Sequence, residues 1–141
     1  MSKLVMRSMW LALCLCVLAL AGCATPGANM MKYDEKVYAY SAAIRWGDFE
    51  GAWTLVDPAY RDAHPISDVE LERYKQIQVA GYREVAMTTL PDGDIVREIE
   101  IDVVNRHTLT QRQTRNTEHW QFDPAAKTWW LVVGLPDFWK E

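Results

Sequence analysis

The spacing of the apolar residues changes once along this chain, and that change constrains the fold more than any other feature. From Met31 to about Lys75 the apolar residues recur every three or four positions, as on one face of a helix. From about Gln78 onward they alternate with polar residues, as in a strand that has one buried face and one solvated face. The chain is therefore expected to be α+β, with N-terminal helices packed on an antiparallel sheet.

The helical part predicts three helices. The first runs from Met31 to Gly47, and its buried stripe consists of Tyr33, Val37, Tyr40 and Ile44. Asp48 is a good N-cap for the second, which carries Phe49, Ala52, Trp53 and Val56 and should end at Asp57 and Pro58. Ser67 and Glu70 form a capping box for the third, which should end near Lys75, with Ile66 and Leu71 as its hydrophobic staple.

The alternating part predicts four strands in a meander. The first places Val79, Arg83, Val85 and Met87 opposite Gln78, Tyr82 and Glu84, and it ends in a turn at Leu90–Gly93. In the second, Ile99, Ile101 and Val103 face the core, while Glu98, Glu100 and Asp102 face solvent. The third carries Trp120 and Phe122, and a turn over 123–127 leads to the fourth, Thr128–Val133.

The N-terminus has the features of a secretory signal. Lys3 and Arg7 precede an apolar run from Met9 to Leu20 that is too short for a comfortable membrane span. The residues that follow, Leu20-Ala21-Gly22-Cys23, resemble the lipobox of bacterial lipoproteins.

The lipobox resemblance implies that residues 1–22 are a signal peptide and that Cys23 is acylated, with palmitate for example, and bound to a lipid bilayer. Ala24, rather than Asp, at the next position resembles the sorting rule of enteric bacteria for an outer-membrane lipoprotein that faces the periplasm. The alternative is an ordinary signal peptide that ends near a cysteine. Cysteine usage favours lipidation, because the chain has only Cys14, Cys16 and Cys23, and cleavage before Cys23 would leave one unpaired thiol.

Residues 23–30 are expected to form the lipidated cysteine and a tether, because this stretch contains Pro26 and Gly27 and has no apolar period. Six extended residues would reach about 20 Å. Residues 31–141 should then form a single domain close to the bilayer. The full chain has a formal net charge of −4, and removal of Lys3 and Arg7 makes it more acidic, so nucleic acid is an unsuitable partner.

The order of elements is similar to that of the nuclear transport factor 2-like superfamily, which includes ketosteroid isomerase and scytalone dehydratase. The segments that carry the resemblance are RWGDFEGAW, EHWQFD and WWLVVGLPDF. The resemblance implies a curved sheet wrapped around the helices into a cone whose open end holds a pocket. The superfamily contains enzymes, ligand binders and interaction modules, and no catalytic motif of the family matches here residue by residue, so no catalytic residue is assigned.

Two sets of residues are candidates for a site. The candidate pocket consists of Tyr40, Trp53, Arg97, Asn105, His107 and Trp120. If the alternation of the second strand continues, Arg97, Asn105 and His107 share the face of Ile99, and His107 could exchange a proton near neutral pH. The alternative is that the strand has left the core at that point. The histidines lack metal-ligand spacing, and we expect neither a metal nor a cofactor.

The second set is a candidate partner surface that consists of Trp129, Trp130, Phe138 and Trp139. Trp129 and Trp130 are adjacent on one strand, so one of them must point outward. The outward one, together with Phe138 and Trp139, could form an apolar patch for a homodimer or another envelope protein. The alternative is that the C-terminal tail packs back over the same tryptophan.

These features predict a membrane-anchored envelope lipoprotein with a small, non-enzymatic domain that binds a ligand or a protein. Two alternatives remain open. One is a small isomerase-like or dehydratase-like enzyme with its pocket in the cone, and the other is a structural scaffold of an envelope complex.

Overall fold

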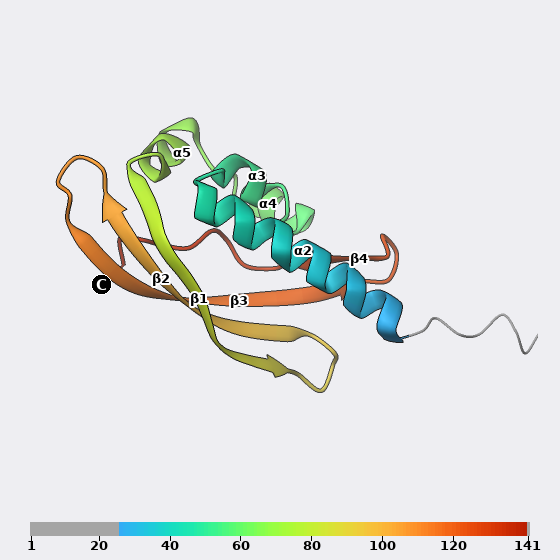
Figure 1. Ribbon diagram of the computed structural model, residues 1–141. Helices are drawn as coiled ribbons and strands as arrows, with labels where there is room; N and C mark the ends of the chain where they lie inside the picture. Colours follow the sequence, from blue (N-terminus) through green and yellow to red (C-terminus); the bar gives the residue numbers. More distant parts are fainter. Residues whose placement is uncertain (1–25, 141) are drawn as a thin grey trace, which may run out of the picture. The chain divides into compact units, whose positions relative to one another are not determined.

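The computed structural model describes residues 26–140 (Figure 1). The signal segment 1–22 and Cys23 lie outside the described residues. Contacts divide the chain after Met30, and the compact unit that begins at Met31 contains the whole of the described sheet. Every buried apolar residue of the described chain lies between Tyr33 and Phe138, so residues 24–141 contain this core in full.

The first described helix, α2 (Pro26–Trp46), begins five residues before the predicted start at Met31. The prediction of an irregular tether is therefore wrong for residues 26–30, which are helical. Proline suits the first position of a helix, where its fixed φ is favourable and its missing N–H is not needed. The buried stripe is as predicted, since Tyr33 and Tyr40 are 2% and 0% exposed. The helix ends at Gly47, whose φ of +75° is unfavourable for residues with a side chain.

Three short helices follow α2: α3 (Phe49–Trp53), α4 (Pro58–Ala63) and α5 (Asp68–Tyr74). The predicted caps are confirmed: Asp48 accepts a hydrogen bond from the Gly51 N–H at 2.9 Å, and the capping box of α5 is complete. Helix α4 was not predicted. Asp57 was expected to end the second helix, and it does lie beyond the end of α3. Its carboxylate also caps α4, by accepting a hydrogen bond from the Tyr60 N–H at 3.1 Å.

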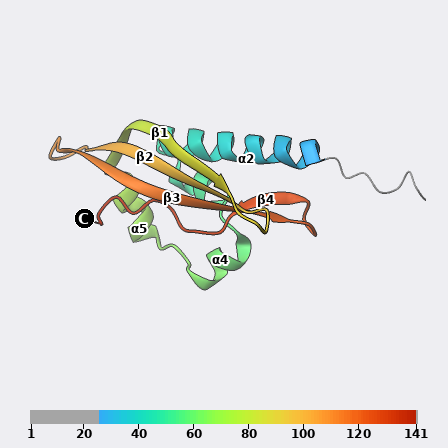
Figure 2. The same ribbon diagram turned by 90° about the horizontal axis from the view of Figure 1, so that it is seen from below.

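The strands of the described chain form one antiparallel sheet in the order β1 (Ile77–Thr89), β2 (Ile95–Asn105), β3 (Gln111–Asp123) and β4 (Thr128–Leu131). The predicted meander is confirmed, and Figure 2 shows β1, β2 and β3 side by side. The β1–β2 turn also matches the prediction, because Gly93 has a φ of +94° and its N–H donates to the Leu90 carbonyl at 2.9 Å.

The predicted faces are correct for β2 and wrong for part of β1. Ile99 and Ile101 of β2 are fully buried. In β1, Tyr82 is 8% exposed and pairs with the buried Ile101, so it faces the core, opposite to the prediction. Met87 pairs with the buried Arg97 and its sulfur contacts the Tyr33 hydroxyl, so it lies on the predicted face, although it is 50% exposed. The ladder between β1 and β2 has register shifts at Val79/Gly81 and at Glu84/Ala86. Each extra residue moves the following side chains to the opposite face, which the alternation in the sequence does not reveal.

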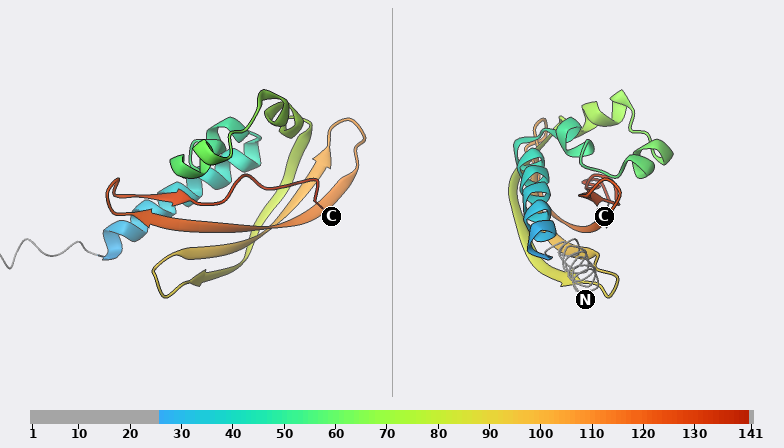
Figure 3. Two further views of the ribbon diagram at one scale, coloured as in Figure 1. Left: turned by 180° about the vertical axis from the view of Figure 1, so that it is seen from behind. Right: turned by 90° about the vertical axis from the view of Figure 1, so that its right-hand side faces the viewer.

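The α+β class is thus confirmed, with the helices on one side of an antiparallel sheet (Figure 1). Beyond β4, the C-terminal segment (residues 132–140) has no regular secondary structure. It runs between β3 on one side and the short helices α4 and α5 on the other (Figure 3). Phe138 holds it there, because this fully buried ring lies 5.9 Å from Phe49 and 5.8 Å from Tyr74, centroid to centroid.

Candidate functional site

The structure brings together three residues of the candidate pocket, Tyr40, Arg97 and Trp120. The rings of Tyr40 and Trp120 are 5.6 Å apart in an edge-to-face arrangement, and both side chains are fully buried. Arg97 and Trp120 both donate hydrogen bonds to Glu118, a residue that the sequence analysis did not single out. The side chains of these residues fill the space between α2 and the sheet.

Glu118 is the centre of a buried polar network, by which we mean Tyr82, Arg97, Glu118 and Trp120. Its Oε2 accepts from Arg97 Nη1 at 2.7 Å and from Trp120 Nε1 at 3.0 Å. Its Oε1 accepts from the Tyr82 hydroxyl. Arg97 Nε also donates to Glu84 Oε2 at 2.6 Å. Glu118 is 0% exposed, so a ligand in solution cannot reach its carboxylate unless the domain opens.

Burial dominates the acid–base properties of this interior. It raises the pKa of Glu118 above the usual value, and Arg97, Tyr82 and Trp120 oppose that shift by favouring the carboxylate. It likewise raises the pKa of Tyr40 and of Tyr82. The Tyr40 hydroxyl is buried and has no hydrogen-bond partner within residues 26–140. The Glu118 carboxyl and the Tyr40 hydroxyl are therefore enclosed and do not face an open site.

The sequence contains a signal for Glu118 that the choice of candidate residues did not use. Glu118 is two residues before Trp120, so strand alternation places both side chains on the face that points to the helices. Arg97 lies on the corresponding face of β2, directly opposite Glu118 in the ladder. Recognising the pair required the β2–β3 register, which is a long-range property of the fold.

Asn105 and His107 do not join the pocket residues. Strand β2 ends at Asn105, and the Asn105 Oδ1 accepts from the N–H groups of His107 and Thr108 at 2.9 and 3.0 Å. His107 is exposed in the turn that follows. The prediction that His107 shares the face of Ile99 is therefore wrong, because the side-chain hydrogen bonds of Asn105 form a turn and end the alternation.

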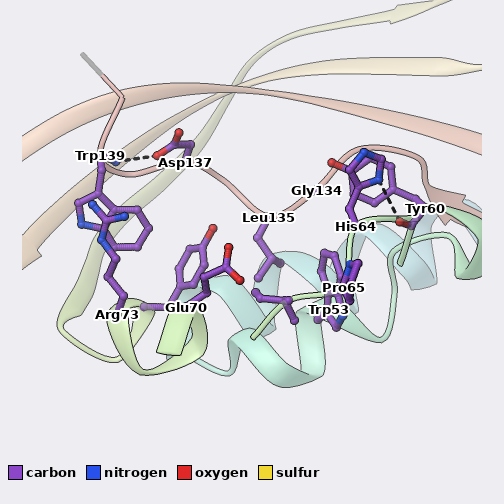
Figure 4. A pocket seen from close by; sticks show the side chains of 12 residues that line it. Trp53, Tyr60, His64, Pro65, Glu70, Arg73, Gly134, Leu135, Asp137 and Trp139 are labelled. Carbon is purple, nitrogen blue, oxygen red and sulfur yellow. Dashed lines mark hydrogen bonds between the residues drawn. The ribbon is translucent and has the colours of Figure 1, made fainter. Parts of the chain in front are cut away.

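Trp53 is also separate from that interior set. It is half-buried, its ring lies 6.3 Å from that of Tyr60, and it lines a groove of about 330 Å³. We call this the aromatic groove. It lies between the short helices and the C-terminal segment (Figure 4). Its lining is Trp53, Tyr60, His64, Pro65, Ile66, Glu70, Arg73, Tyr74, Gly134, Leu135, Asp137 and Trp139.

A cation–π contact between Arg73 and Trp139 forms one end of the aromatic groove. The Arg73 guanidinium lies 4.0 Å from the centroid of Trp139, and Figure 4 shows the two stacked side chains beside Asp137. At the other end the rings of His64 and Tyr60 stack at 4.3 Å. Both ends thus present flat faces that suit a ring-shaped or planar group on a ligand.

Carboxylates lie between these two ends. The hydrogen bonds from Ser67 lower the pKa of Glu70, so this exposed side chain is anionic near neutral pH. Asp137 Oδ1 accepts from the Trp139 N–H at 2.9 Å, which fixes the carboxylate beside the ring. The groove therefore offers stacking surfaces and polar groups of fixed position, the usual composition of a binding site.

The residues of the candidate partner surface do not form one exposed patch. Trp129 is 5% exposed and packs 5.2 Å from the Tyr33 ring, and Phe138 is fully buried. Trp130 is half-buried beneath the Lys36 ammonium, which lies 5.4 Å from the ring centroid, and Trp139 is part of the aromatic groove. The C-terminal tail does pack back on the domain, but against Tyr74 and its neighbours in the core.

Within residues 26–140 no group of three or more His, Cys, Asp or Glu side chains is placed to hold a metal ion. In the same range no helix combines the length and the apolar character needed to cross a bilayer. Comparisons with protein-family models, with curated proteins and with solved structures find no match to this chain. The function must therefore be inferred from the residues themselves.

Proposed function

We propose that this chain is a lipid-anchored protein of a bacterial envelope, and that its domain is a non-enzymatic binding module of the nuclear transport factor 2-like class. The anchor is the acylated Cys23 of the lipobox, and Ala24 favours the periplasmic face of the outer membrane. The α+β order of elements, with the helices on one side of the meander, is consistent with that class.

The observation that carries the proposal is the filled interior. An isomerase or dehydratase of this architecture needs an ionisable group that faces a bound substrate. Here the space between α2 and the sheet is occupied by Tyr40 and the buried polar network, and Glu118 has no solvent-exposed surface. The aromatic groove, in contrast, is open and offers stacking and hydrogen bonding.

The aromatic groove is therefore the proposed ligand site. The C-terminal segment forms one wall of it, and that wall is anchored by Phe138 and by the hydrogen bond from the Tyr74 hydroxyl to the Pro136 carbonyl at 2.9 Å. A wall fixed in this way is preorganised, which lowers the entropic cost of binding.

The anchor is tested by labelling cells that express the full chain with radioactive palmitate and fractionating them. We expect the chain to be labelled and to sediment with membranes. Cys23→Ser should abolish the label and release a folded protein to the soluble fraction. Cys16→Ser is the matched control, since it also removes a cysteine but leaves the lipobox intact. Membrane retention and labelling of Cys23→Ser would refute the anchor.

The binding module is tested by native mass spectrometry of residues 24–141. We expect any small molecule that copurifies with this protein to be lost on Trp53→Ala and retained on Glu118→Gln. A bound mass that depends on Glu118 and not on Trp53 would place the ligand in the interior and would favour the enzyme.

A further inference from the structure

The middle of the sheet has an open edge. Strand β3 pairs with β2 along 111–120, but it pairs with the short β4 only from Trp120 to Asp123. The last contact on the β4 side is the hydrogen bond from the Val132 N–H to the His119 carbonyl at 2.9 Å. Beyond it the C-terminal segment leaves the strand, so in the described chain the edge of β3 over 112–117 has no ladder partner.

The backbone groups on this edge can be identified from the ladder. The His119 carbonyl points to the β4 side, and backbone direction alternates along a strand. Gln113, Arg115 and Thr117 therefore direct their N–H and C=O groups to the open edge. The β2–β3 ladder has no register shift, so these groups are evenly spaced. The other open edge of the sheet, β1, is interrupted by two bulges, a common protection against pairing with another chain.

A groove of about 700 Å³ follows the open edge. Its lining is Arg112, Gln113, Thr114, Arg115, Asn116, Thr117, Val133, Gly134, Leu135, Asp137 and Lys140. One wall is thus β3 and the other is the C-terminal segment, and Figure 3 shows the two running together toward the C-terminus. Six residues of extended chain span about 20 Å, so one added strand of five or six residues matches the unpaired length.

The charges of the groove favour an acidic occupant. Arg112, Arg115 and Lys140 are cationic and exposed, against the single carboxylate of Asp137. Arg115 lies 3.9 Å from Glu100, its nearest acidic partner, and its side chain is 76% exposed. Asn116 adds a donor, since its Nδ2 is buried and has no hydrogen-bond partner within residues 26–140. This basic strip belongs to a chain whose net charge is negative.

We propose that the open edge of β3 binds an extended acidic segment of a partner protein by strand addition. Three residues, Gln113, Arg115 and Thr117, supply the main-chain hydrogen bonds, while Arg112 and Lys140 attract the acidic side chains. This surface lies on the other side of the C-terminal segment from the aromatic groove. It depends neither on the lipid anchor nor on a ligand in that groove.

The test uses fluorescein-labelled peptides and residues 24–141 in fluorescence anisotropy. The probe alternates valine and glutamate, VEVEVEV. One control replaces glutamate by lysine, VKVKVKV, and another places proline at the centre, VEVPVEV, which removes a ladder N–H. We expect the acidic probe to bind, and both controls to bind at least tenfold more weakly. Raising the salt from about 20 to 200 mM should weaken the acidic probe several-fold.

Variants locate the surface. Arg112→Glu with Lys140→Glu should weaken the acidic probe at least tenfold. Arg106→Glu with Lys127→Glu changes the net charge equally, and these exposed residues do not line the groove, so binding should be nearly unchanged. Hydrogen exchange gives a readout independent of charge: saturating peptide should slow the amides of Gln113, Arg115 and Thr117 at least tenfold.

Three outcomes would overturn the proposal. The first is equal binding of the lysine or proline peptide, and the second is no binding of the acidic probe at millimolar protein concentration. The third is protection of the same amides by dimerisation of the chain without peptide, which would make a second copy the occupant of the edge.

Discussion

Arg97 Nη1 lies 2.7 Å from Glu118 Oε2, and the two residues face each other as direct partners across β2 and β3. Their side chains are 7% and 0% exposed, so the pair is enclosed by the domain. Removing charges from water is costly, and the pair persists because Tyr82, Trp120 and Glu84 supply further hydrogen bonds. Such a pair is sensitive to the loss of one partner and tolerant of the loss of both.

Glu118→Leu is expected to lower the free energy of unfolding of residues 24–141 by about 3 to 5 kcal/mol. The change leaves the Arg97 charge without its buried partner, and it leaves the Tyr82 hydroxyl and the Trp120 N–H without an acceptor. Urea denaturation followed by tryptophan fluorescence measures the loss.

Arg97→Met combined with Glu118→Leu is the control for that loss. Replacing both charges by apolar side chains removes the unpaired ion, so the double variant should be clearly more stable than Glu118→Leu alone. If the two single losses simply added, the ion pair would not couple these residues and the account of the interior would be wrong.

Tyr40 and Tyr82 should respond in opposite ways to the same substitution. Tyr40→Phe removes a buried hydroxyl that has no partner within residues 26–140, so stability should rise by about 1 kcal/mol or more. Tyr82→Phe removes a hydrogen bond to the Glu118 carboxylate and should cost about 1.5 to 3 kcal/mol. Thermal and urea unfolding of the two variants give the comparison. A loss for Tyr40→Phe would show that the hydroxyl has a partner, such as an internal water.

The raised pKa of Glu118 predicts a pH dependence of stability. Because burial raises this pKa in the folded domain, the folded state binds the proton more tightly than the unfolded chain. The resulting stabilisation is complete below about pH 4, the usual range for glutamate, and is lost as the pH rises through the folded pKa. The stability of the wild-type domain relative to Glu118→Gln should therefore fall as the pH rises above about 4.

Urea unfolding at one-unit steps of pH tests this direction. Glu98→Gln is the control, since Glu98 lies on the other face of β2 and bonds to the Thr117 hydroxyl at 2.8 Å. A wild-type advantage that grew with pH would instead mean that Arg97, Tyr82 and Trp120 together outweigh burial and lower the pKa of Glu118.

Local signals predicted the helices well. Asp48 and Ser67 cap α3 and α5 through hydrogen bonds to residues three positions further along the chain. A short stretch of sequence therefore contains both partners of each cap. The strand order was also predictable, because tight turns join neighbours in the chain. The missed helix α4 has the same kind of local cap, but Asp57 and Pro58 serve equally well as the end of one helix and the start of the next.

The candidate site was less predictable because it depends on distant pairings. The partners Arg97 and Glu118 are 21 residues apart, and only the β2–β3 register aligns them. The first bulge of β1 places Tyr82 on the buried face, and the second places Met87 on that same face, although strict alternation would separate the two. An alternating sequence pattern does not show where a bulge lies. The aromatic groove forms only because the C-terminal segment packs against α5, and no local sequence pattern predicts that contact.

Trp120 and Trp53 differ in burial, although the sequence pattern places both in the core. Trp120 is 0% exposed and contacts Tyr33 and Tyr40, so Trp120→Ala should cost about 3 to 5 kcal/mol. Trp53 is half-buried on the wall of the aromatic groove, so Trp53→Ala should cost only about 1 to 2 kcal/mol while it removes a stacking surface. Urea unfolding measures the loss of unfolding free energy in the two variants. Equal losses would contradict the assignment of Trp120 to the core and of Trp53 to the groove wall.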